Sequence, residues 1–215
     1  ALKLKKIIID SLPATAIGEI VLFASATLFG QSVKDVDLLM IGQVQNYSVN
    51  CEFLAGDEGF KTDRVEIQSF CTAIEIKRHD ISGVFMNGTD IYVKYGLKNH
   101  CVTNQSNKQK ESVKLFFEKT ITATPFITNI IWFTQITPKD IRGLLSNNGK
   151  VMRSNVLGSD FDFKDMMQLL VWQKAPFLRR GVYVYDSNYS TASFNEIQNA
   201  ISLFSRTKTQ MGELT

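Results

Sequence analysis

The stretch of residues 126–136, FITNIIWFTQI, most restricts what this 215-residue chain can fold into. A strand with one face in water alternates apolar and polar side chains, whereas this run is apolar almost without interruption. Such a run is typical of a strand that is covered on both faces. We therefore expect an α/β protein built around a buried sheet.

Other patterns indicate the elements around that strand. Residues 13–29 are interpreted as a largely buried helix, because Pro13 suits a first turn and Gly30 a C-terminal cap. Three extended segments, separated by turn signals that include a polar region at 56–64, are predicted as strands: 35–42, 47–54 and 65–77.

A hairpin is predicted at residues 82–95, because Asn87-Gly88 favours a type I′ turn. An amphipathic helix is predicted over residues 108–119. The order helix, strands, helix, strand predicts a mixed central sheet.

The part after residue 136 is expected to be mostly helical. Helix starts are predicted at Thr137-Pro138, at Asp160 or Asp162 with the helix running to Trp172, and at the capping box Ser193-x-x-Glu196. Residues 181–186, GVYVYD, are a further predicted strand. We expect residues 1–136 to form the core and residues 137–215 to form an α/β or helical extension packed on it.

Composition narrows the class of protein. Hydrophobic residues make up 44% of the chain, which suits a packed core rather than a disordered segment. Cys51, Cys71 and Cys101 are widely spaced and form no zinc or disulfide pattern, so reduced thiols and a cytoplasmic location are expected. No segment is predicted to span a membrane. A net charge of +3 permits a polyanionic partner without requiring one.

Glu75-Ile76-Lys77 is the strongest candidate for chemistry. In a strand, Glu75 and Lys77 point to one face and Ile76 to the other. Metal-assisted phosphodiester cleavage uses such a pair, because the carboxylate holds Mg²⁺ and the lysine positions the attacking water. The alternative is an ordinary ion pair on a half-exposed strand.

Two further carboxylates could belong to such a site. Asp37 lies within a predicted strand, where it is either a ligand or a solvated residue near the strand end. Glu19 is the only charged residue between Asp10 and Lys34. It is interpreted as a second metal ligand or as the partner of Lys77, or else as part of an exposed helix edge.

Polar and basic residues follow the candidate pair along the chain. Gln105 and Gln109 stand four residues apart and extend an apolar helical stripe, so they could hold a phosphate or a hydrated metal, or simply form a polar first turn. Residues 77–119 carry eight Lys and Arg against four Asp and Glu, which suits phosphate contacts or a solvated face. His79 and His100 are expected to lie on the surface or to bond locally.

Taken in order, these motifs resemble the nuclease-related domain (NERD) family of the PD-(D/E)xK nuclease superfamily, over roughly residues 15–136. The matching motifs are a Gly-Glu in a first helix, a strand Asp, an ExK strand followed by a hairpin, and a Gln that opens a second helix: Gly18-Glu19, Asp37, Glu75-Ile76-Lys77 and Gln105.

The resemblance implies a restriction-endonuclease-like αβββαβ core and a set of site residues. It implies that Lys77 is the catalytic lysine, and that Mg²⁺ or Mn²⁺ binds at these positions: Asp37, Glu75, Ile76 and auxiliary Glu19. Substrate contacts are expected from these residues: Gln105, Gln109, Arg78 and Lys108. Because residues 43–70 lengthen the gap before the ExK strand, Asp63 or Glu66 could replace Asp37, and Gln109 could be the true equivalent of Gln105.

The function that the resemblance implies is a metal-dependent endonuclease domain acting on DNA. Such domains are commonly fused to helicases or NTPases, with roles in nucleic-acid repair or antiviral defence. The alternative is a catalytically silent domain of the same fold that binds nucleic acid or docks a partner. A third hypothesis is that residues 137–215 form a helical extension that oligomerises the protein.

Overall fold

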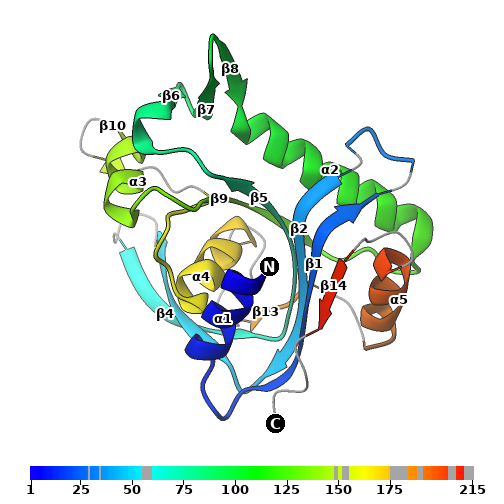
Figure 1. Cartoon of the computed structure of the whole chain (residues 1–215). Coiled ribbons are helices and arrows are strands. Elements are labelled where there is room, and N and C mark those ends of the chain that lie inside the picture. Colours follow the sequence, from blue (N-terminus) through cyan, green and yellow to red (C-terminus); the bar gives the residue numbers. More distant parts are fainter. Residues whose placement is uncertain are drawn as a thin grey trace.

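The computed structural model describes residues 1–28, 30–33, 35–54, 60–147, 150–151, 155–174, 184–187, 191–202 and 207–210. It is a mixed α/β protein, as the sequence predicts, with helices on both sides of a central sheet (Figure 1). Along the described chain, none of the helices combines the length and apolar character needed to cross a membrane.

The central sheet has six strands. In spatial order they are β12 (Val156–Leu157), β9 (Ile127–Phe133), β5 (Ser69–Lys77), β2 (Asp35–Gln45), β1 (Ile17–Thr27) and β14 (Thr207–Gln210). β9 pairs in parallel with β12 and β5, whereas the pairs from β5 to β14 are antiparallel. All seven residues of β9 are buried, which confirms the strand predicted from the apolar run at 126–136.

The helix predicted over residues 13–29 is wrong, because Ile17–Thr27 forms β1. Ile20 packs in the core on one face of the sheet and Val21 in the core on the other, so the strand shows no polar alternation. Gly18 has φ +145°, and a Cβ there would collide with the carbonyl oxygen of Gln43 on β2. This close approach of two strands requires glycine.

A second sheet continues from the first. β3 (Ser48–Leu54) pairs with β4 (Phe60–Ile67), and β4 pairs in parallel with β13 (Val184–Tyr185). The single extended segment expected at 65–77 is therefore two strands, β4 and β5, in different sheets. Of the strand predicted at 181–186, residues 184–185 form β13, residue 186 lies outside it, and residues 181–183 lie outside the described chain.

A third sheet shares no strand with the central one and lies at the top of Figure 1. It contains β6 (Val84–Asn87), β7 (Asp90–Tyr95) and β8 (Lys98–Cys101), after a short 3-10 helix at Ile81–Gly83. The hairpin predicted at 82–95 is confirmed, with Gly88 at φ +61° in its turn. We name β7, β8 and their connecting turn the β7–β8 hairpin.

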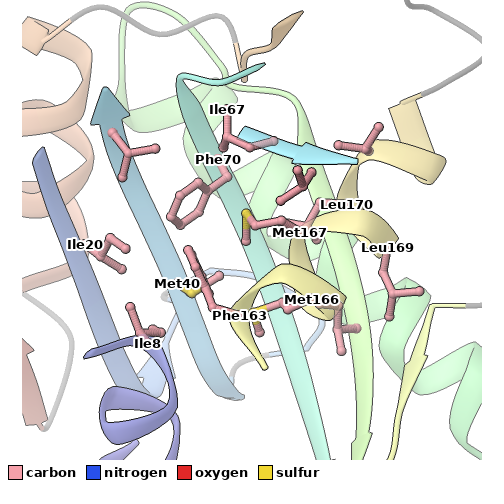
Figure 2. Packing of buried hydrophobic residues seen from close by; sticks show 14 of the residues in the cluster. Ile8, Ile20, Met40, Ile67, Phe70, Phe163, Met166, Met167, Leu169 and Leu170 are labelled. Atoms are coloured by element: carbon pink, nitrogen blue, oxygen red, sulfur yellow. The ribbon is translucent and has the colours of Figure 1, made fainter. Parts of the chain in front are cut away.

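Helices cover both faces of the central sheet. α1 (Leu2–Ser11) and α4 (Phe163–Lys174) lie on its concave side in Figure 1, and α2 (Val102–Thr120) and α5 (Thr191–Ser202) lie on the other side. Figure 2 shows the core on the α1 and α4 side, where these labelled side chains meet: Ile8, Ile20, Met40, Ile67, Phe70, Phe163, Met166, Met167, Leu169 and Leu170. A separate core, which includes Val113 of α2 and Ile197 of α5, fills the opposite face.

Most of the predicted helix starts agree with the structure. α3 (Pro138–Leu145) is capped by the Thr137 hydroxyl, as predicted. The Asp162 carboxylate accepts from the backbone N–H of Asp165 at 2.7 Å, so Asp162 rather than Asp160 caps α4. The capping box at 193–196 is wrong because α5 begins at Thr191.

Elements after residue 136 complete the structure formed by earlier ones. β12 and β14 lie at opposite edges of the central sheet. α4 supplies Phe163 and Met167 to one core and α5 supplies Ile197 to the other. A short pair, β10 (Ser146–Asn147) and β11 (Lys150–Val151), follows α3. The division at residue 136 stays a prediction, but strands from both sides of it share one sheet.

Candidate active site

Glu75 and Lys77 lie together near the end of β5, on the face of the sheet that α2 covers. Cys71 and Ala73, which share this face by strand alternation, belong to the core beneath α2. The Glu75 side chain is 1% exposed and Lys77 is 6% exposed, and they form an ion pair. Lys77 therefore partners Glu75, and the predicted pairing of Lys77 with Glu19 is wrong.

The Glu75 carboxylate is buried, although its charged form is more stable in water. Burial raises the pKa of Glu75 above its usual range, and the negative charge of Asp37 raises it further. Hydrogen bonds from Lys77 and Gln109 act in the opposite direction. A buried carboxylate with a raised pKa, beside a lysine and a second carboxylate, is typical of a functional site.

Asp37 lies in a strand, as predicted, and this strand, β2, is the neighbour of β5. The antiparallel register aligns Leu38 with Ile74, and its continuation places Asp37 opposite Glu75. One oxygen of the Asp37 carboxylate accepts from the backbone N–H of Ile76 at 2.8 Å. The bond fixes this carboxylate beside the ExK segment, so β2 and β5 bring two acidic side chains to one place.

Gln105 and Gln109 reach the pair from α2 and bind different partners. The Gln105 amide oxygen accepts from the Lys77 ammonium at 3.1 Å. The Gln109 amide nitrogen donates to the Glu75 carboxylate at 2.5 Å. α2 begins at Val102 rather than at residue 108, so Gln105 lies in its first turn, as the resemblance implies. Both glutamines therefore belong to the site, one for each member of the ion pair.

Gln109 also carries an unsatisfied acceptor. Its side chain is 1% exposed, and its amide oxygen is buried with no hydrogen-bond partner. Leaving a buried acceptor unsatisfied costs about 1–3 kcal/mol. An acceptor of this kind next to a buried carboxylate suits a water molecule or a cation.

His100 extends the hydrogen-bonded chain to the surface, which the sequence did not indicate. Its Nε2 atom lies 2.6 Å from the Gln105 amide oxygen, the same atom that accepts from Lys77. The bond is local, as expected for His100, yet it joins β8 to the site. Sequence spacing could not reveal this link, because Gln105 connects to Lys77 only through the packing of α2 on β5.

Three other acidic residues that were candidate metal ligands lie away from the Glu75–Lys77 pair. Glu19 on β1 pairs with Gln43 on β2. Gln43 is six residues from Asp37 along β2, and six residues of a strand span about 20 Å. The Glu19 carboxylate accepts from Gln198 at 3.2 Å. Asp63 and Glu66 lie on β4 in the second sheet. Asp37 is therefore the acidic residue that the fold brings to Glu75.

Arg78 and Lys108 are basic residues close to the site in the sequence. Arg78 directly follows Lys77 and is exposed, and Lys108 is exposed one turn after Gln105 on α2. Their role in binding a substrate stays a prediction.

The donor set fits a hard divalent cation. Within the described ranges, no three His, Cys, Asp or Glu side chains gather around one point. Mg²⁺ does not need three, because it is usually held by one or two carboxylates and keeps several waters. Asp37 and Glu75 would hold it, together with the Ile76 carbonyl oxygen. The unsatisfied Gln109 oxygen is a further acceptor for one of its waters.

An apolar pocket of about 310 Å³ lies elsewhere, between α3, α4 and β12. Ile141, Leu145 and Trp172 are among its lining residues, and none of the predicted site residues contributes to it. The pocket is therefore separate from the Glu75–Lys77 pair.

Comparisons of the chain with protein-family models, with curated proteins and with solved structures found no match.

Proposed function

We propose that this protein is a metal-dependent nuclease domain that hydrolyses phosphodiester bonds in DNA. The observation that carries the proposal is the buried Glu75–Lys77 pair, with Asp37 fixed beside it by the Ile76 N–H. A buried ion pair is weak support for stability, because desolvation offsets its attraction. Function is the better reason for a fold to keep this pair.

The order of elements supports the same proposal. With β3, β4 and the third sheet set aside as insertions, the chain runs α1, β1, β2, β5, α2, β9. This order is αβββαβ, the order expected for a restriction-endonuclease-like core. The agreement arises with α1 in place of the helix expected at 13–29, and with residues 13–29 supplying the first strand.

Each residue has a distinct task in the proposed reaction. Asp37 and Glu75 would hold the cation, and Mg²⁺ bound there would supply polarisation of the scissile phosphate and a water of lowered pKa. Lys77 contacts the attacking water or the phosphate oxygens and offsets their negative charge. Gln105 orients the Lys77 ammonium and Gln109 orients the Glu75 carboxylate. Arg78 and Lys108 would contact neighbouring phosphates.

One observation favours the alternative, a silent nucleic-acid-binding domain. Lys77 and Gln109 already occupy the Glu75 carboxylate, and its raised pKa disfavours the charged form that a metal requires. A titration with Mg²⁺ or Mn²⁺ separates the two functions. A nuclease binds the metal and loses that binding in Glu75→Gln, whereas a silent domain binds none in either form.

The test of the nuclease itself uses variants that keep side-chain shape. Glu75→Gln and Lys77→Met are expected to lower cleavage of plasmid and oligonucleotide DNA in Mg²⁺ by at least about 100-fold, because each removes a group that acts at the phosphate. Glu111→Gln, an exposed change on α2, is the control and should cleave like the wild type. Full cleavage by either site variant, with correct folding shown by circular dichroism, would overturn the proposal.

The kind of larger protein to which such a domain would belong is inferred from the sequence resemblance alone. As part of the same proposal, it would act as the effector of a larger nucleic-acid-processing or defence protein, fused to a helicase or NTPase. Sizing the purified chain in solution tests the further expectation of a homo-oligomer.

A further inference from the structure

A line of side chains leads from the buried ion pair to the tip of the β7–β8 hairpin. Lys77 donates to Gln105, and Gln105 lies 2.6 Å from the His100 ring. The ring centroid of His100 is 6.2 Å from that of Tyr95. Tyr95 pairs with Lys98 across the hairpin. The site therefore continues, contact by contact, onto one face of the hairpin.

Tyr95 is the centre of this face. Its ring centroid lies 4.7 Å from that of His79 and 6.2 Å from that of His100, and both pairs of rings are edge-to-face, so the only two histidines of the chain contact it. Contacts with two rings restrict the Tyr95 ring, yet 52% of the side chain is exposed. A partly fixed aromatic ring loses little entropy when it binds a flat partner.

The charge on the hairpin suits a polyanion. The hairpin contains Lys94, Lys98 and one acid, Asp90, at the end of β7 away from the tip. By strand alternation Lys98 lies on the same face as Tyr95, whereas Lys94 lies on the opposite face, over the Phe85 ring. Leu97 at the turn is fully exposed, so the tip combines an apolar side chain, an aromatic ring and one ammonium group. A purely apolar tip would suit another protein, whereas aromatic and cationic groups in alternation are what nucleic-acid strands bind.

We propose that this face of the β7–β8 hairpin binds an unpaired nucleic-acid strand that extends from the site, with a base stacked on Tyr95 and a phosphate at Lys98. The inference rests on the proposed nuclease function and names its substrate class as single-stranded or locally unpaired nucleic acid. The faces of the bases are covered by neighbouring pairs inside a duplex, so Tyr95 can stack only on a base that has left the helix.

Tyr92 provides a matched control on the same strand. It points to the opposite face of β7 by strand alternation and stacks on Phe85 at 5.5 Å. A change there alters a tyrosine of the same hairpin without touching the line from Lys77.

Binding is measured by fluorescence anisotropy of a labelled single-stranded oligonucleotide and its duplex, in EDTA so that no strand is cut. We expect the wild type to bind the single strand more tightly than the duplex. Tyr95→Leu should weaken single-strand binding by roughly 5- to 150-fold, since one stacked base contributes about 1–3 kcal/mol. Tyr95→Phe, which keeps the ring, should bind nearly as the wild type does, and so should Tyr92→Leu.

Salt dependence tests the phosphate contact separately. For a single strand, each phosphate contact contributes about 0.7 to the slope of log K against log salt, and Lys98→Ala should remove about one such contribution. An unchanged slope would show that Lys98 makes no phosphate contact and would overturn that part of the inference.

The outcomes separate this inference from the nuclease proposal. Cleavage by the wild type together with unchanged single-strand binding in Tyr95→Leu would overturn the stacking inference and leave the nuclease intact. A wild type that prefers duplex would also overturn it. A wild type that binds no oligonucleotide and cuts none would overturn both.

Discussion

At the scale of single residues, the Lys77 ammonium has contacts from two directions. Glu75 approaches it along β5 and Gln105 from α2, in a place that is almost closed to water. Removing two charges from water costs several kcal/mol per ion before their attraction offsets it. Removing one member of the pair is therefore expected to lower the free energy of unfolding strongly. Replacing both members with apolar residues is expected to lower it little.

This expectation can be measured by chemical unfolding. Lys77→Met alone leaves the Glu75 charge buried without its partner, so the free energy of unfolding should fall by about 3–5 kcal/mol at neutral pH. The double variant Glu75→Leu, Lys77→Met removes both charges and should recover most of that loss, or exceed the wild type by about 1–4 kcal/mol. A double variant no more stable than Lys77→Met would show that the stranded Glu75 charge does not cause the loss and would contradict this expectation.

The raised pKa of Glu75 predicts a pH dependence with a defined sign. Because its folded-state pKa lies above the unfolded value, the folded protein binds more protons between the two. Stability from this group is complete below the usual glutamate pKa of about 4.3 and is lost as pH rises through the folded pKa. In urea unfolding at a series of pH values, Glu75→Gln should lack this decline and Glu111→Gln should keep it. The same decline in Glu75→Gln would assign it to another group.

At the scale of elements, the sequence predicted half-exposed and sharply bounded elements better than fully buried ones. The turn at Asn87-Gly88 and the cap at Thr137 carry local chemistry that tertiary packing did not override. Residues 17–27 are apolar on both faces, and such a run cannot be distinguished from a buried helix by periodicity. Its β-branched and aromatic content, with Ile20, Val21 and Phe23, was the signal for a strand.

In the candidate site, too, local sequence patterns could be predicted and tertiary packing could not. Alternation along a strand placed Glu75 and Lys77 on one face, and helical spacing placed Gln105 and Gln109 in one stripe, so these pairs could be predicted. The sequence did not contain the register that puts Asp37 opposite Glu75 and keeps Glu19 distant. It also could not predict that Tyr95 and His100 extend the site, because that depends on where the third sheet packs.

Gly18 offers a test of the element in which it lies. In a helix, Gly18→Ala would stabilise the protein by about 1 kcal/mol. In β1, φ at Gly18 is +145° and a Cβ would clash with the backbone of β2. The same change should therefore destabilise the protein by about 1–3 kcal/mol or more. Gly88→Ala is the comparison: φ is +61° and a Cβ would meet no atom within 4 Å, so only backbone strain of about 1–2 kcal/mol is expected. A more stable Gly18→Ala protein would contradict the strand.

At the scale of the whole molecule, the elements after residue 136 belong to the same packing as those before it. Phe163 and Leu170 of α4 are fully buried against the concave side of the sheet. β12 also covers the edge of β9 that would otherwise be unpaired. The candidate site, with Asp37, Glu75, Lys77, Gln105 and Gln109, lies on β2, β5 and α2, yet the sheet that holds it depends on later residues.

A fragment of residues 1–136 should therefore fail to fold on its own. Without α4, the apolar surface beside Ile20, Met40 and Phe70 would be exposed, and an exposed patch of this kind promotes aggregation. Circular dichroism and urea unfolding should show no cooperative transition for the fragment, in contrast to the full chain. A cooperative transition would establish residues 137–215 as an addition to an independent core.

The contact between α1 and α4 also determines when the protein can fold. The Ser11 hydroxyl accepts from the N–H of Phe163, a residue 152 positions later, and β1 pairs with β14 at residues 207–210. Pairings between such distant segments are slow to form, because the loop they close must lose its freedom first. On a ribosome, Leu4 and Ile8 would wait for α4 to emerge. Until α4 has been synthesised, the apolar face of α1 has no partner, which makes the growing chain a natural client for chaperones that bind nascent chains.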